Sequence, residues 1–250
     1  MAKTHLEDLD WNKLGFKYHD LPYRWVDEFK DGKWQGGHLT QDSSITFNEA
    51  AEELHYGQEV FEGLKAYRRK DGGINLFRPE QNAKRMANSA KRLLMEPYPE
   101  DEFIKAVKEV VKANQDFVPP YGSGGTLYIR PFMMGMQPIV GVSPSETYQF
   151  RIYATPVGAY IKGLKPMPYE VSDYDRAAPA GTGQAKTAGN YASSLMPRKM
   201  DLRMLFIWIL KNTNTLMNLV VPISSVLLKM VNSKHLNQIL SCHLLLSVQF

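Results

Sequence analysis

Apolar residues along the first 155 positions follow two different periods. Over residues 79–95 and again over residues 102–117 they recur at intervals of three and four, which predicts two amphipathic helices. Residues 126–134 and 147–155 are rich in β-branched and aromatic side chains, and we interpret both as strands. The chain therefore mixes helices and strands from its beginning.

Turn-forming residues separate the shorter elements. Residues 31–37 contain Asp-Gly and Gly-Gly pairs, which are typical of a hairpin tip. A short helix is expected over residues 49–56, and a strand over residues 62–67 has its hairpin partner at residues 72–77. Together these elements predict a compact α+β unit.

The region after residue 155 begins a second part of the chain. Residues 1–155 form the predicted small N-terminal α/β domain, and residues 156–168, rich in Pro and Gly, form the predicted interdomain connection. Residues 169–200 would begin a larger domain, with a helix starting within residues 190–198.

Composition adds few constraints. The chain has 250 residues, of which 44% are hydrophobic and 22% charged, and a net charge of +4 without a dominant basic stripe. This suits an anionic small ligand and argues against nucleic acid. The single cysteine, Cys242, excludes an internal disulfide framework, and the first ten residues have no apolar signal core, so a cytoplasmic location is expected.

Candidate chemistry centres on Lys186, which lies among small residues between Gly181 and Tyr191. A lysine whose amine can be deprotonated forms Schiff bases with carbonyl compounds, and neighbouring glycines let a bulky group approach the backbone. The alternative is a solvated loop lysine. Acid-poor, glycine-rich surroundings favour a site. A nucleotide-binding P-loop is disfavoured, because Ala180 and Ala185 replace glycines that this motif requires.

Four motifs in order point to one family. They are HYGQEVFEGLK at 55–65, FRPEQNAKRM at 77–86, YIRP at 128–131 and AKTAGNYASSL at 185–195. Together they resemble the branched-chain-amino-acid aminotransferases, pyridoxal-phosphate enzymes of fold type IV, and the match runs from about residue 10 to about residue 198. The resemblance implies an α+β, fold-type-IV architecture with a small N-terminal α/β domain and a larger C-terminal domain, incomplete here.

The resemblance also implies roles around the cofactor, pyridoxal 5'-phosphate. Lys186 would bind the cofactor's aldehyde and then carry a proton between the substrate Cα and the cofactor. Tyr191 would contact the cofactor's phenolic oxygen, and Arg85 would hold its phosphate. Without the family, Arg85 is better interpreted as a surface helix arginine.

Four further residues would bind substrate. The resemblance places Tyr56, Tyr128 and Arg130 near the substrate carboxylate and side-chain pocket, with Phe61 lining the apolar part. For Arg130 the sequence favours a site even without the family, because a strand position between Ile129 and Pro131 is an unusual place for a solvated charge. Glu62 and Arg176 gain no role from the resemblance, and both could pair at a surface. No metal site is expected.

The implied reaction transfers the amino group of L-leucine, L-isoleucine or L-valine to 2-oxoglutarate. D-amino-acid transamination and aminodeoxychorismate lyase chemistry are the alternatives within fold type IV. Partners would be amino acids and 2-oxo acids, with neither nucleic acid nor membrane involved, and full-length members are typically homodimers.

The tail over residues 201–250 differs from the rest. It contains no Gly, Ala, Glu or Tyr, and the resemblance stops at about residue 199. Codons can be chosen for residues 200–250 so that the reading frame two bases later spells GFADAIYLDPKKHKHIDEFGGANFFGI and continues with strand and turn patterns. We therefore expect a frame-shifted family gene, and poor folding with negligible turnover for the chain as written. A genuine apolar extension is the alternative, and Asn212 and Lys229 argue against membrane spans.

Overall fold

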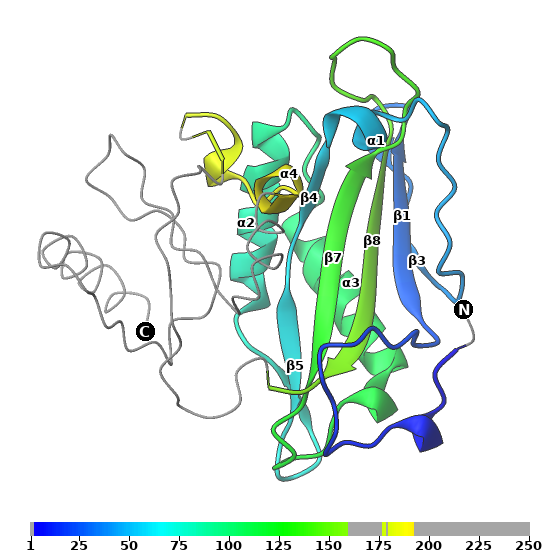
Figure 1. Cartoon of the computed structure of the whole chain (residues 1–250), viewed down its shortest axis with the longest axis vertical. Coiled ribbons are helices and arrows are strands. Elements are labelled where there is room, and N and C mark those ends of the chain that lie inside the picture. Colours follow the sequence, from blue (N-terminus) through cyan, green and yellow to red (C-terminus); the bar gives the residue numbers. More distant parts are fainter. Residues whose placement is uncertain (1–2, 160–176, 179, 193–250) are drawn as a thin grey trace, which may run out of the picture. The chain divides into compact units, whose positions relative to one another are not determined.

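The computed structural model describes residues 3–159, 177, 178 and 180–192 (Figure 1). Contacts divide the chain into one unit of Met1–Tyr160 with Gln184–Ala188, and a second of Ile161–Gly183 with Gly189–Phe250. The predicted connection beyond residue 159, Arg176 and the whole tail lie outside the described residues. The predicted domain boundaries stay a prediction.

The first unit contains groups of strands separated by helices. The strands are β1 (Arg24–Lys30), β2 (Lys33–Trp34), β3 (His38–Thr40), β4 (Glu59–Phe61), β5 (Leu64–Arg68), β6 (Ile74–Leu76), β7 (Thr126–Gly135) and β8 (Tyr148–Val157). The helices are α1 (Glu52–Tyr56), α2 (Pro79–Arg92), α3 (Glu100–Ala113) and, in the second unit, α4 (Gly189–Ala192). Single 3₁₀ turns occupy Leu6–Asp8, Gln115–Phe117 and Thr182–Gln184.

All eight strands of the described residues join one antiparallel sheet. The order along its main path is β2-β1-β8-β7-β5-β6, with β3 paired to β1 and β4 paired to β7. The ten-residue strands β7 and β8 pair along their whole length, from Thr126 opposite Val157 to Gly135 opposite Tyr148. They form the centre of the sheet, and the other strands pair on either side of them.

The two faces of the sheet carry different residues because side chains alternate along a strand. On β7, Leu127, Ile129 and Met133 are buried in a core shared with the apolar faces of α2 and α3 (Figure 1). Tyr128 and Arg130 point to the opposite face and are only half-buried. The face away from α2 and α3 is therefore the one that carries polar chemistry.

The helix predicted over residues 79–95 is confirmed as α2, but it ends at Arg92, three residues earlier than predicted. The Met95 N–H donates to the Ala90 carbonyl and the Leu94 N–H to the Lys91 carbonyl, while Leu94 has a φ of 56°. These bonds form a Schellman motif, which ends a helix by satisfying its last carbonyls. Buried Met95 packs in the core beyond this stop, so an apolar residue at helical spacing does not belong to the helix.

The predicted strand over residues 62–67 is confirmed as β5, which begins two residues later than predicted, and its hairpin partner is β6; a further strand, β4, was not predicted. Two strands, β4 and β5, run along the same side of β7 and are interrupted at Glu62 and Gly63. Opposite the break lies Pro131, which accepts the Glu62 N–H through its carbonyl but has no N–H to return. The missing donor therefore interrupts the ladder and turns Glu62 away from regular pairing.

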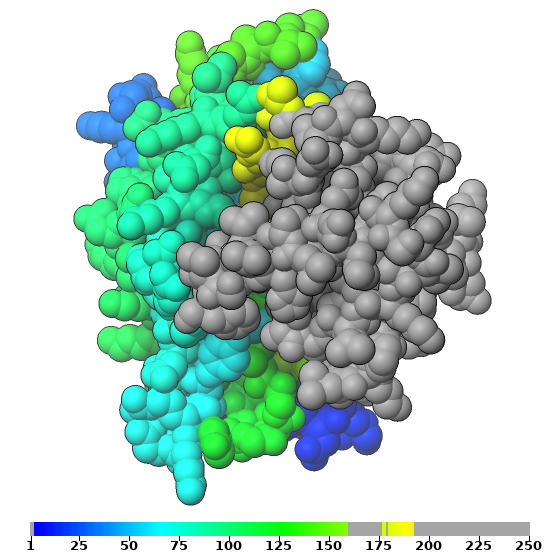
Figure 2. All heavy atoms as spheres, turned by 90° about the vertical axis from the view of Figure 1, so that its left-hand side faces the viewer, coloured from blue at the N-terminus to red at the C-terminus, as the bar shows by residue number. Residues whose placement is uncertain are grey.

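The other predicted elements are confirmed with shifted ends. Asp31 and Gly32 both have positive φ and form the tip of the β1–β2 hairpin. Helix α1 begins at Glu52 rather than at residue 49, and α3 begins at Glu100, directly after Pro99. The β5–β6 hairpin ends in an exposed turn over residues 69–73, visible at the lower end of the space-filling view (Figure 2).

Candidate active site

Lys186 lies at the edge of the sheet beside β4. Its carbonyl accepts the Phe61 N–H at 3.0 Å, and Thr187 forms an antiparallel bridge with Val60. Since β4 pairs with β7 on its other side, the backbone around Lys186 acts as a further short strand. The glycine-rich loop is thereby tied to the sheet at its lysine.

A second bond ties the same lysine to helix α2. The Lys186 N–H donates to the Ser89 hydroxyl at 2.9 Å, and Ser89 is 2% exposed. The backbone of Lys186 is therefore held from both directions, by a strand through its carbonyl and by a helix through its amide. This fixes the base of the side chain, which a solvated loop lysine would not require.

Aromatic and cationic groups gather around the lysine side chain. The Lys186 Nζ is 4.4 Å from the centroid of the Phe61 ring, and the Arg130 Cζ is 4.7 Å from the same centroid. Arg130 also donates to the Tyr128 hydroxyl from Nε at 3.2 Å and from Nη2 at 2.8 Å. The structure thus brings together four predicted site residues: Phe61, Tyr128, Arg130 and Lys186.

Arg130 stays cationic in this cluster. Burial acts to lower its pKa, but the neighbouring Tyr128, Tyr153 and Glu59 outweigh burial and raise the pKa above its ordinary value. A half-buried guanidinium on the polar face of the sheet is suited to pair with a carboxylate. The substrate-binding role expected for Arg130 stays a prediction.

Arg85 contacts an acid that received no role from the sequence. Its Nε donates to Glu62 Oε1 at 2.6 Å and its Nη2 to Glu62 Oε2 at 2.7 Å. Glu62 is fully buried, whereas 56% of the Arg85 side chain is exposed. The suggestion that Glu62 pairs at a surface is therefore wrong: the interruption of the strand turns its carboxylate toward α2.

A pair of carboxyl groups lies on the β4 side of the cluster. Burial, followed by the neighbouring charge of Glu59, raises the pKa of Glu53 to about 8. Burial also raises the pKa of Glu59, although the charge of Arg130 and the neighbouring Glu53 act in the other direction. A proton is thus retained near Arg130 at neutral pH.

Two predicted site residues, Tyr56 and Tyr191, are not among the contacts described above. The Tyr56 hydroxyl donates to the Val140 carbonyl at 2.5 Å, in the segment that follows β7. Tyr191 lies in α4 of the second unit, where Asn190 donates to the Thr182 carbonyl and accepts the Thr182 hydroxyl proton. The roles expected for Tyr56 and Tyr191 stay predictions.

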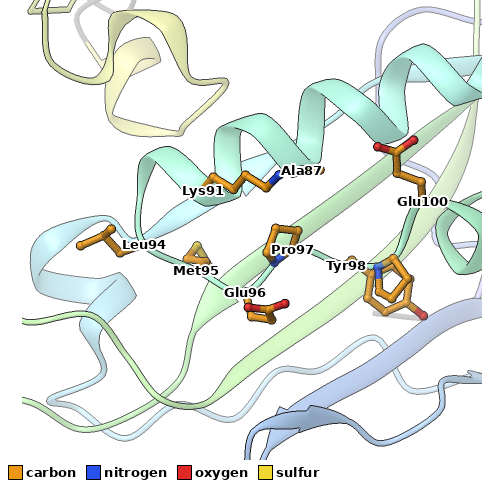
Figure 3. Close-up of a pocket in the computed structure, with 9 residues that line it drawn as sticks. Ala87, Lys91, Leu94, Met95, Glu96, Pro97, Tyr98 and Glu100 are labelled. Atoms are coloured by element: carbon orange, nitrogen blue, oxygen red, sulfur yellow. The ribbon is translucent and has the colours of Figure 1, made fainter.

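One hollow of the first unit lies elsewhere. It measures about 600 Å³ and is open to solvent between the end of α2 and the start of α3 (Figure 3). Its lining includes Lys91, Leu94, Glu96 and Tyr98, and none of the predicted site residues. We therefore assign the candidate site from side-chain contacts around Lys186 and not from this hollow.

Comparison with known proteins identifies the family. The model of the family described as amino-transferase class IV matches residues 59–213, more than half of the chain. The chain belongs to the class IV aminotransferases. A branched-chain-amino-acid aminotransferase of Haemophilus influenzae is 55% identical over 196 residues, which are 78% of this chain and 57% of that protein. Its counterpart in Helicobacter pylori is 46% identical over 199 residues, 78% of this chain and 58% of that protein.

Solved structures agree with the fold-type-IV assignment. A branched-chain aminotransferase of Thermoproteus uzoniensis, solved with norvaline, has a TM-score of 0.59 and 26% identity over 74% of this chain and 59% of that one. A T.th. branched-chain amino acid aminotransferase, solved with pyridoxamine 5'-phosphate, has a TM-score of 0.58 and 27% identity over 78% of this chain and 60% of that one. The α+β, fold-type-IV prediction is confirmed.

This chain spans a little over half the length of the two curated relatives quoted above. Activity, substrate and assembly of a whole enzyme are therefore matters of proposal for this chain. Among the helices of the described residues, none has the length and apolar character that crossing a bilayer needs.

Sequence reasoning missed several residues that hold the site. Ser89 and Asn82 lie one helical turn on either side of Arg85 along α2. This spacing could have indicated that both share a helix face with the candidate arginine. Glu62 follows Val60 and Phe61 in an apolar strand, where an unpaired acid would be costly. Glu53 and Glu59 carried no comparable signal, because they meet only across the turn at Gly57.

Proposed function

We propose that the protein is a pyridoxal-phosphate-dependent aminotransferase that transfers the amino group of L-leucine, L-isoleucine or L-valine to 2-oxoglutarate. The observation that carries the proposal is the double fixation of Lys186, by Phe61 of β4 and Ser89 of α2, with its amine beside Phe61 and near Arg130. The two relatives quoted above are branched-chain-amino-acid aminotransferases, which supports the substrate class.

The residues present fit pyridoxal phosphate. Its aldehyde requires a primary amine and its phosphate a cationic hydrogen-bond donor, and Lys186 and Arg85 supply these groups from adjoining elements. Arg85 donates to Glu62 from Nε and Nη2, and 56% of its side chain is exposed. When bound, the cofactor supplies the electron sink that lets the substrate Cα–H bond break.

The remaining chemistry belongs to the chain. Lys186 would take the proton from the substrate Cα and return it to the cofactor side, because its backbone is fixed at both the carbonyl and the N–H. Arg130, kept cationic by Tyr128 and Glu59, would bind the substrate carboxylate. The Phe61 ring would exclude water and accept an aliphatic side chain, which favours Leu, Ile and Val over polar amino acids.

Homodimeric assembly and a cytoplasmic location belong to the same proposal, as does the frame shift after residue 199. The chain as written would then be an inactive product, while one added base before codon 200 would restore the enzyme. D-amino-acid transamination and aminodeoxychorismate lyase activity find no support in the names of the relatives quoted above.

The experiment compares two purified proteins, the 250-residue chain and the product of the source gene with the frame restored. Each is supplied with pyridoxal phosphate, L-leucine and 2-oxoglutarate, and glutamate formation is followed. We expect turnover by the restored protein, its loss in Lys186→Ala, and preference for L-leucine over D-alanine. Turnover by the 250-residue chain would refute the prediction that the chain as written is inactive, and turnover that survives Lys186→Ala would refute the assignment of the lysine.

A further inference from the structure

We propose that Glu62 is a positioning residue: its buried carboxylate holds the Arg85 guanidinium in a fixed orientation, the one in which Arg85 would bind the phosphate of the cofactor. This inference rests on the proposed function and extends it to a residue with no assigned role. It explains why a fully buried acid lies in the interruption between β4 and β5.

The carboxylate of Glu62 is satisfied by four donors. Besides the two Arg85 bonds, Asn82 Nδ2 donates to Oε2 at 2.8 Å and the Gly63 N–H donates to the same oxygen at 3.2 Å. A charge buried to 0% exposure persists only with such pairing. Asn82 lies three residues before Arg85 on α2, so the helix supplies both side-chain donors.

The bidentate contact fixes the orientation of an otherwise mobile side chain. An exposed arginine has many rotamers, and ordering it upon binding an anion costs entropy. Glu62 engages Nε and Nη2, which sets the plane of the guanidinium before any ligand arrives. More than half of the Arg85 side chain nevertheless remains exposed, so the fixed group can still reach a ligand.

Two consecutive residues hold the lysine and the arginine. Phe61 binds the Lys186 carbonyl through its N–H, and Glu62, the next residue, binds Arg85. On the helix side, Ser89 binds the Lys186 N–H and lies four residues after Arg85, on the same face of α2. Lys186 and Arg85 are therefore positioned from one shared frame, as a ligand with an aldehyde at one end and a phosphate at the other would require.

Other roles for Glu62 make different predictions. If Glu62 only joins α2 to the sheet, a folded variant would bind cofactor as before. If it mainly neutralises Arg85, removing its charge would strengthen phosphate binding. Positioning predicts the opposite, namely weaker phosphate binding although a negative charge has been removed.

The test uses the frame-restored protein without cofactor and measures the Kd of pyridoxal phosphate and of pyridoxal, which lacks the phosphate. We expect Glu62→Gln to weaken pyridoxal phosphate at least 10-fold and to change pyridoxal less than 2-fold. Glu80→Gln removes an exposed acid near the start of the same helix and is the matched control, for which both Kd values should be unchanged. Arg85→Gln should produce the loss by itself, and adding Glu62→Gln to it should produce little more.

A second variant covers failure to fold. Glu62→Asp keeps the buried charge but retracts the carboxylate by one methylene, and it should also weaken pyridoxal phosphate selectively. Unchanged or tighter pyridoxal phosphate binding in the folded variants would overturn the role of Glu62 while leaving the proposed function in place. Failure of the unmodified protein to bind pyridoxal phosphate through Lys186 would overturn both.

Discussion

The carboxyl pair of Glu53 and Glu59 should make the folded protein less stable as the pH rises. The pKa of Glu53 is about 8 in the folded protein against 4.5 for an ordinary glutamate, so between these values the folded state binds a proton that the unfolded state has released. Stability therefore falls with rising pH across this window. Below pH 4.5 both states bind the proton and the full contribution is present.

The size of the effect follows from how far the pair is exposed. Glu53 is only half-buried, so solvent screening reduces the free energy of unfolding lost between pH 4.5 and 8 to about 1–2 kcal/mol. In a protein of this length such a loss lowers the Tm by roughly 2–8 °C. Glu53→Gln imitates the protonated form and should abolish this part of the pH dependence.

The assay is denaturant unfolding of the frame-restored protein, followed by tryptophan fluorescence at pH 4.5, 6 and 9. We expect the unmodified protein to lose about 1–2 kcal/mol more than Glu53→Gln between pH 4.5 and 9. Glu102→Gln, which removes an exposed acid paired with Lys105, serves as the control and should keep the slope of the unmodified protein. Equal pH slopes for Glu53→Gln and the unmodified protein would refute the coupling of the pair.

Three further changes test the frame of the site. Gly63→Ala would place a Cβ 2.5 Å from the Tyr128 hydroxyl and should displace that hydroxyl from Arg130. The KM for L-leucine should then rise about 10-fold, and the Kd of pyridoxal phosphate is measured alongside as an independent readout. Ser89→Ala leaves the part-buried Lys186 N–H without its hydroxyl acceptor, which should destabilise the protein by about 1–3 kcal/mol in denaturant unfolding, whereas Ser89→Thr should retain most stability. Arg130→Met should weaken L-leucine at least 10-fold while leaving pyridoxal-phosphate affinity within 2-fold, and equal losses of both would contradict its assignment to the substrate carboxylate.

Much of the first unit could be predicted because its signals are local. The periods of α2 and α3, the Asp31-Gly32 turn and the β7 and β8 strands depend on neighbouring residues in the chain. The interruption at Glu62 could not be predicted in the same way, since it depends on Pro131, which pairs with this region only in the folded sheet. Local patterns do not reveal such partners.

The candidate site divides along the same line. Lys186, Arg85 and Arg130 could be proposed from their motifs, but the residues that hold the first two, Ser89 and Glu62, are defined by contacts across 97 and 23 positions. Helix α2 brings these distant segments together. A sequence pattern can nominate a reactive residue, whereas its orientation is decided by partners that only the fold supplies.

The most direct test of the site is to identify the lysine that binds the cofactor. The frame-restored protein and the 250-residue chain are each incubated with pyridoxal phosphate, reduced with borohydride, digested and analysed by mass spectrometry. We predict stoichiometric label on the peptide containing Lys186 in the frame-restored protein, and no stoichiometric label in the 250-residue chain. Label on another lysine, or none in the frame-restored protein, would contradict the assignment of Lys186 as the centre of the site.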